Sequence, residues 1–209
     1  MRTRLFFATL FSAALLASCS KGGTTNQEQT PPVAQAKEVY IDATSTTLWH
    51  YFSLTDNKSV GTGEETPADN KSWAARKDWD IAVSRYRCRT NSGEATTVGA
   101  QGGVCALDAA TTFNSVTSLP TTANFAADKT TLELGHGGVQ TNIIKSSASV
   151  ILFKTNDDGN MIMPPVYLPT PVYIFRTADG KGYYKVQFTQ YQNEQSVTGH
   201  VKFYSAKIL

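Results

Sequence analysis

The C-terminal part of the chain contains a run in which apolar side chains occupy every second position. Within residues 183–189 these apolar side chains are Tyr184, Val186 and Phe188. A period of two is typical of a β-strand with one buried face. A second apolar run lies at residues 172–176, and Asp179-Gly180 between the two runs is a strong hairpin-turn signal. The pattern therefore predicts a pair of antiparallel strands.

Short apolar runs recur along most of the chain and predict an all-β fold. We expect a single domain of antiparallel strands, sandwich-like, with at most short helical turns. Helices are expected only at residues 68–76, capped by Asp69, and at residues 108–116. A second hairpin is expected to turn at residues 156–160. The other predicted strands lie at residues 39–41, 48–54, 79–86, 131–134, 150–153, 161–163 and 200–204.

The first 19 residues predict where the protein works. Arg2 and Arg4 precede an apolar run over residues 5–16. This run is typical of a signal peptide and is shorter than the roughly 20 residues that a membrane-spanning helix needs. Residues 16–19, Leu-Ala-Ser-Cys, resemble the lipobox of bacterial lipoproteins, in which the cysteine is lipidated and becomes the N-terminus. We expect a signal peptide over residues 1–18 and a lipid on Cys19; an ordinary secretory signal is the alternative.

Cleavage after residue 18 changes the charge of the chain. It takes Lys+Arg from 19 to 17, which equals the 17 Asp+Glu, so that the formal net charge falls from +2 to zero. No electrostatic case for nucleic acid remains, and contact with a membrane is expected only through the lipid anchor. Residues 19–38 are polar and predict a flexible tether, followed by the folded domain over residues 39–209.

Two cysteines remain besides the lipidated one. Cys88 and Cys105 bracket a glycine-rich stretch without an apolar pattern. Because an exported protein works where thiols can oxidise, we expect a disulfide between them, which would stabilise the fold by about 3 kcal/mol. Two buried free thiols are the alternative.

The sequence holds no recognisable catalytic motif. There is no Gly-x-Ser-x-Gly, no His-Glu-x-x-His and no phosphate-binding loop, and the three histidines lack the spacing of a zinc site. We therefore expect that the protein is not an enzyme.

Two short segments contain side chains that can bind haem iron. His136 lies in the segment Leu-Gly-His-Gly-Gly, where the glycines leave room for a large flat group, and Met161 and Met163 would point to one face of an extended chain. Imidazole and thioether are both axial ligands of haem iron. The alternatives are an exposed loop histidine and methionines that fill the core.

Several blocks of sequence also resemble a known family. They are LWHYFS at residues 48–53, DWDIAVSRY at 78–86 followed by Arg89-Thr90-Asn91 and Gly93, VYIFRTADG at 172–180 and KVQFTQY at 185–191. In this order, behind a lipobox and a tether, they resemble the HmuY-like haem-binding lipoproteins of Bacteroidetes-type bacteria. The resemblance covers residues 39–204.

The resemblance implies a haemophore on the outer membrane. We expect it to be exposed at the cell surface; the periplasmic face of the membrane is the alternative. Such proteins take haem from host or community haemoproteins and pass it to a TonB-dependent receptor. Members of the family hold the iron with two axial side chains. Carried over to this sequence, the positions of these two ligands lie near His136 and near Met161 or Met163. No histidine lies between His136 and His200, so the sequence departs from the family's histidine pairs. We expect His136 and Met163 as the iron ligands, with Met161 as the substitute, because Pro164 holds Met163 extended. A surface β-sandwich lipoprotein that binds a glycan or a protein instead of haem is the alternative.

Overall fold

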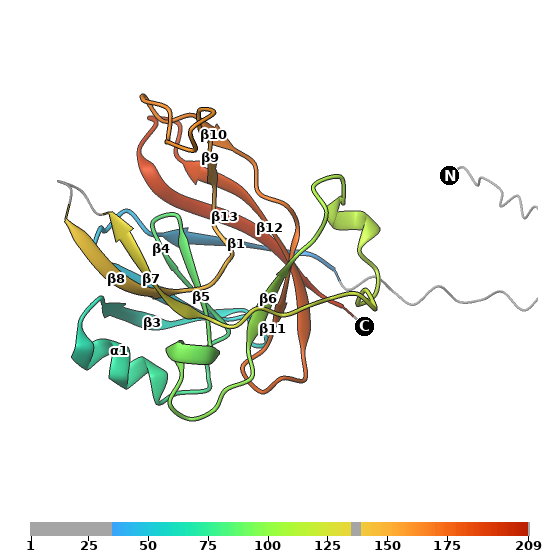
Figure 1. Cartoon of the computed structure of the whole chain (residues 1–209). Coiled ribbons are helices and arrows are strands. Elements are labelled where there is room, and N and C mark those ends of the chain that lie inside the picture. The colour runs from blue at the N-terminus through green and yellow to red at the C-terminus, as the bar shows by residue number, and fades with distance from the viewer. Residues whose placement is uncertain (1–34, 135–138, 209) are drawn as a thin grey trace, which may run out of the picture. The chain divides into compact units, whose positions relative to one another are not determined.

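The computed structural model describes residues 35–134 and 139–208, and the regular secondary structure of this part of the chain consists mainly of antiparallel strands (Figure 1). Its sheets confirm the predicted all-β, sandwich-like class. No helix within these residues is long and apolar enough to cross a membrane.

The larger sheet has five strands in the order β1-β13-β12-β11-β6. The hairpin predicted at its centre is present, with Tyr173 opposite Val186 and Arg176 opposite Tyr183. Its turn contains Gly180 at a φ of 76°, a conformation that glycine adopts without strain. The strands are β1 (Lys37–Asp42), β6 (Gly103–Ala106), β11 (Tyr173–Arg176), β12 (Tyr183–Gln192) and β13 (Thr198–Lys207).

The second sheet has four strands in the order β3-β2-β4-β5. These strands are β2 (Leu48–Ser53), β3 (Lys58–Glu64), β4 (Ile81–Ser84) and β5 (Arg87–Thr90). Two further strand pairs complete the sheets of the described residues: β7 (Lys129–Leu134) with β8 (Gln140–Lys145), and β9 (Leu152–Phe153) with β10 (Tyr167–Leu168).

The main core lies between the two large sheets. Both sheets contribute alternate, inward-facing residues, among them Val39, Phe52, Ile81, Phe175 and Phe203. Burial of these side chains is the main force that holds the sheets together, at about 25 cal/mol per Å² of apolar surface.

A second core lies beneath the short helix α1 (Pro67–Ala74). The ring of Trp73 stacks on that of Tyr51 with centroids 3.7 Å apart. The cap of this helix differs from the prediction: Thr66 is the N-cap, and its hydroxyl accepts the backbone N–H of Asp69. The Asp69 carboxylate instead accepts the backbone N–H of Glu64.

Several predicted boundaries are wrong. The strand β1 begins at Lys37, so the last two residues of the predicted tether belong to the sheet. The helix expected at residues 108–116 is reduced to a 3₁₀ turn over Phe113–Ser115. The predicted turn at residues 156–160 is present, with Asn156 N–H donating to the Asn160 carbonyl at 2.8 Å. The predicted strand pair beside it is wrong, because β9 pairs with β10, and of residues 161–163 only Met161 forms an isolated bridge, opposite Thr155.

The predicted disulfide is also wrong: within the described residues, Cys88 and Cys105 are both free and buried. Cys88 lies in β5 and packs in the main core, whereas Cys105 lies in β6, in the other sheet. On β6 it is Val104 that faces the main core, so the alternation of side chains turns Cys105 to the opposite face, among Val172 and Ile174. Burial raises the pKa of the Cys88 thiol far above its usual value, which makes it a poor nucleophile.

Candidate functional site

The two predicted methionine ligands lie in the 13-residue connection between β9 and β10. Local backbone bonds hold this connection: Lys154 N–H donates to the Val166 carbonyl at 2.9 Å, and Ile162 N–H donates to the Lys154 carbonyl at 3.1 Å. Neither methionine fills the core. The side chain of Met161 is 44% exposed and that of Met163 is 74% exposed, so both thioethers can reach a ligand from solvent.

The predicted histidine ligand, His136, lies outside the described residues. The strands on either side of it in the chain are β7, which ends at Leu134, and β8, which begins at Gln140. These strands pair in register from Lys129 opposite Lys145 to Leu134 opposite Gln140. The β8 strand was not expected from the sequence.

Exposed apolar side chains concentrate on the two segments that carry the predicted ligands. Of the eleven large hydrophobic side chains that are exposed among the described residues, two lie on the β7–β8 hairpin and five on residues 152–168, seven in all. These are Leu132 and Val139 on the hairpin, and Leu152, Met161, Met163, Val166 and Leu168 on the other segment. An exposed apolar patch marks a binding site more often than isolated exposed residues do, and five of the seven side chains lie within residues 152–168.

A row of aromatic rings connects the β9–β10 segment to the main core. Phe153 of β9 lies between Tyr86, at 5.0 Å between centroids, and Tyr167 of β10, at 5.6 Å. Tyr167 in turn meets Tyr191 of β12 at 5.5 Å. Edge-to-face contacts of this kind are favourable beyond their buried area. The row therefore fixes the base of the methionine segment against the main core.

A cleft of about 550 Å³ opens beside the β7–β8 hairpin. Its size falls within the range of small-molecule sites. The β4–β5 turn, Arg85 and Tyr86, forms part of its wall, and Glu133 of β7 and Ile143 of β8 form another part. Neither methionine is among its lining residues, so the structure does not bring the methionines into this cleft.

Charged side chains attach the hairpin to the second sheet. Arg87 Nε donates to Glu133 Oε2 at 2.6 Å, and Lys145 donates to the other oxygen of the same carboxylate. Burial alone would raise the pKa of Glu133, but the hydrogen bonds from Lys145 and Arg87 outweigh it, so that the pKa is lowered. Glu133 is therefore ionised at neutral pH and holds β7 and β8 beside β5.

A buried carboxyl group, that of Asp128, anchors the start of the β7–β8 hairpin to the residues at the end of β5. Asp128, directly before β7, accepts the backbone N–H of Thr90 at 2.9 Å and its hydroxyl at 2.5 Å. Its own backbone N–H donates to Ser92 Oγ at 3.0 Å. Desolvation raises the pKa of Asp128 to about 7, although the hydrogen bonds from Thr90 and Ser92 lower it.

This carboxyl predicts a loss of stability with rising pH. Asp128 is protonated in the folded protein up to a pKa of about 7, whereas the unfolded carboxyl ionises near pH 4. Between these values the folded state binds more protons, so the free energy of unfolding should fall by about 2–4 kcal/mol from pH 4 to pH 7. Asp128→Asn should flatten this dependence in urea titrations. The exposed Asp158→Asn variant should retain it, and an unchanged slope in Asp128→Asn would contradict the assignment.

The comparisons with known proteins agree with the fold. The sequence model described as HmuY protein matches residues 45–204, and the chain belongs to that family. None of the curated proteins matches the sequence significantly.

Several solved structures share the architecture. A Bacteroides fragilis protein described as a lipoprotein is 22% identical with a TM-score of 0.59, over 81% of this chain and 88% of its own. A Bacteroides vulgatus protein described as HmuY-like and heme-binding is also 22% identical with a TM-score of 0.59, over 81% and 90%. The apo HmuY analog of Tannerella forsythia is 21% identical with a TM-score of 0.55, over 85% and 99%. At these identities the likeness shows the fold alone.

Proposed function

We propose that this protein binds haem, with His136 and Met163 as axial ligands on opposite faces of the iron and Met161 as the substitute for Met163. The observation that carries the proposal is the exposed apolar surface on the two segments that contain these residues. Membership of the HmuY family and the heme-binding description of one structural neighbour support it.

The described residues fit such a ligand. Haem is a flat, largely apolar ring whose iron takes two axial side chains, and methionine with histidine is an established ligand pair. Apolar side chains such as Leu152, Val166 and Leu168 would cover a flat apolar group and exclude water from it. The exposure of Met163, 74% against 44% for Met161, favours Met163 as the sulfur ligand.

The protein's own part in binding is to position two segments that are far apart in the sequence. The aromatic row from Tyr86 to Tyr191 braces the methionine segment, and the Arg87–Glu133–Lys145 cluster braces the hairpin that leads to His136. A site assembled on braced segments loses less conformational entropy when its ligand binds.

The proposal extends to the place and purpose of binding. The lipobox ending at Cys19 supports a lipoprotein, and we place it on the outer membrane, facing outward. There it would take haem from host haemoproteins and deliver it to a TonB-dependent receptor. This role needs binding and release but no bond-making chemistry, which agrees with a sequence without a catalytic motif.

A haemin titration tests the proposal. The purified protein should develop a sharpened, red-shifted Soret band that saturates at one equivalent of haemin, because two axial ligands give six-coordinate, low-spin iron. Protein unfolded in urea serves as the control for non-specific uptake. A titration without a sharpened Soret band would contradict the proposal and favour the alternative of a non-haem ligand, a glycan or a protein.

A further inference from the structure

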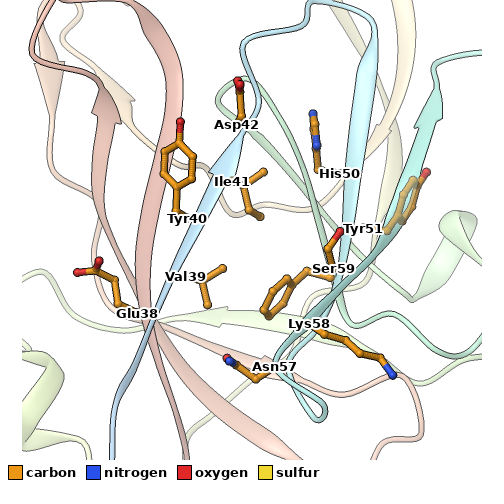
Figure 2. A pocket seen from close by; sticks show the side chains of 11 residues that line it. Glu38, Val39, Tyr40, Ile41, Asp42, His50, Tyr51, Asn57, Lys58 and Ser59 are labelled. Carbon is orange, nitrogen blue, oxygen red and sulfur yellow. The ribbon is translucent and has the colours of Figure 1, made fainter.

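A second groove, of about 400 Å³, lies far along the chain from the proposed haem ligands, beside the first strand of the larger sheet (Figure 2). One wall is the whole run Glu38–Asp42 of β1, and the other is formed by β2 and by the turn into β3. Figure 2 shows β1 on one side, with Asn57 and His50 projecting from the other side.

The strand β1 is an edge strand, and its outer backbone groups face this groove. Ala43 N–H donates to the Gly199 carbonyl at 2.8 Å, and this pair continues the β1–β13 register in which Ile41 lies opposite Val201. In an antiparallel ladder every second residue bonds to the neighbouring strand. Val39 and Ile41 therefore bond to β13, and the N–H and C=O groups of Glu38, Tyr40 and Asp42 point to the free edge.

Two side chains of the opposite wall end in buried polar atoms without a partner. Within the part of the chain that the structure describes, His50 Nε2 and Asn57 Oδ1 have no hydrogen-bond partner. Desolvation lowers the pKa of His50, partly offset by Asp42, so its ring is neutral at pH 7. A buried polar atom left unpaired is destabilising, and a ligand with hydrogen-bonding groups would relieve that cost.

The side chains around the edge define what can bind there. Val39, Ile41 and Phe52 give the groove an apolar floor, continuous with the main core. On the outer face of β1 the exposed side chains are those of Glu38, Tyr40 and Asp42, and Lys202 Nζ lies 4.0 Å from Glu38 Oε1. An added strand would therefore need apolar residues at alternate positions and basic residues opposite Glu38 and Asp42.

Two other occupants fit less well. If a second copy paired with β1 and centred on Tyr40, Glu38 of each copy would lie opposite Asp42 of the other, and opposed like charges are destabilising. The polar residues 20–30 of this chain, SKGGTTNQEQT, contain no apolar side chain for the floor and only one cation, Lys21.

From these observations we infer that β1 is a docking edge for an extended segment of another protein, in which apolar residues alternate with basic ones. The segment adds antiparallel to β1 as a sixth strand of the larger sheet. Its inward residues contact Val39, Ile41 and Phe52, and its outward basic residues meet Glu38 and Asp42. Main-chain bonds provide most of the affinity, as in other cases of strand addition.

The probe that tests this inference is a fluorescein-labelled, capped peptide, Thr-Lys-Val-Thr-Val-Lys-Thr. It should bind the full-length protein saturably in fluorescence anisotropy. A matched peptide with Glu in place of both Lys should bind at least tenfold more weakly. Tyr40→Pro removes an edge N–H without removing a β1–β13 bond and should weaken binding at least tenfold. Tyr40→Ala, which loses the same side chain but keeps the N–H, should stay within about threefold.

Amide exchange locates the bound peptide and identifies a different occupant. In the free protein the amides of Glu38, Tyr40 and Asp42 should exchange fast and those of Val39 and Ile41 slowly, and the peptide should slow the fast set. Slow exchange of these three amides without peptide would overturn the inference. If their exchange rate then depended on protein concentration, a second copy would occupy the edge. If it did not, the chain's own N-terminal segment would occupy it. Absence of peptide binding, or equal binding by Tyr40→Pro in a protein that melts at the wild-type temperature, would also overturn it. Haemin binding is a separate readout, so either proposal can fail alone.

Discussion

Replacing His136 with alanine is expected to abolish the six-coordinate, low-spin spectrum of the haem complex in both oxidation states. The imidazole is the stronger of the two proposed ligands, and a thioether alone holds ferric iron poorly. The measurement is the absorbance spectrum of the haemin complex before and after reduction with dithionite. His200→Ala is the matched control, since His200 is half-buried on β13 and hydrogen-bonded to the Tyr40 hydroxyl. The haemin complex of His200→Ala should give the wild-type spectrum.

The methionine variants complete this experiment. Met163→Ala should damage the ferrous complex at least as much as the ferric one, because the soft sulfur prefers Fe(II). Met161→Ala should then be nearly silent, and the opposite result would make Met161 the ligand. Both residues lie exposed in one connection, so neither variant should lower the melting temperature of the free protein by more than a few degrees. Wild-type spectra from all three variants would mean that other side chains hold the iron.

The sequence predicted the elements whose pattern is local. The hairpin of β11 and β12 was evident from alternation and from Asp179-Gly180, and its register follows from the turn. The strands β1, β2, β4 and β13 also coincide with apolar runs, because each buries alternate residues in a core between two sheets. The all-β class needed nothing beyond these signals.

The strands β3, β5 and β8 lie outside the predicted strands because their sequences are mostly polar, and β6 and β10, also outside them, are only four and two residues long. In β5 and directly after it, Arg89, Thr90, Asn91 and Ser92 are each at most 3% exposed, although their side chains are typical of loops. Their burial depends on partners elsewhere in the chain, such as Asp128 and Ile144, and no local pattern announces those partners. The expected disulfide was wrong for a related reason, since the direction of each thiol depends on the pleat of a strand that was not recognised.

For the candidate site too, the sequence indicated some residues and gave no sign of others. The sequence offered His136, Met161 and Met163 through their chemistry, and the structure exposes both methionines. It offered no sign of the Arg87–Glu133–Lys145 cluster, whose first two members are 46 residues apart. Charges that lie together in space and far apart in the sequence carry no periodic signal: Glu133 is on β7 and Lys145 on β8, and they meet only because these two strands pair in the fold.

The side chain of Arg89 shows how much the fold depends on one such buried polar group. It is 3% exposed, and all five of its N–H donors have acceptors. Both Glu65 oxygens accept from Nη2 at 2.8 Å, and Nε donates to the Ile144 carbonyl at 2.6 Å. The guanidinium also lies 4.0 Å from the centroid of the Trp49 ring. Arg89 thus joins β5 to β2, to the start of α1 and to β8.

Arg89→Ala is therefore expected to cost about 3–5 kcal/mol of unfolding free energy, because it leaves a carboxylate and a carbonyl that are largely buried without their donor. Arg89→Lys should recover only part of this loss, since an ammonium cannot reproduce the planar, five-donor fork. The matched control is Arg76→Ala, whose ion pair with Asp78 is exposed and should contribute no more than about 1 kcal/mol. Urea titrations of the three variants give the comparison. Equal losses from Arg89→Ala and Arg76→Ala would mean that the network around Arg89 does not hold the hairpin and the second sheet together.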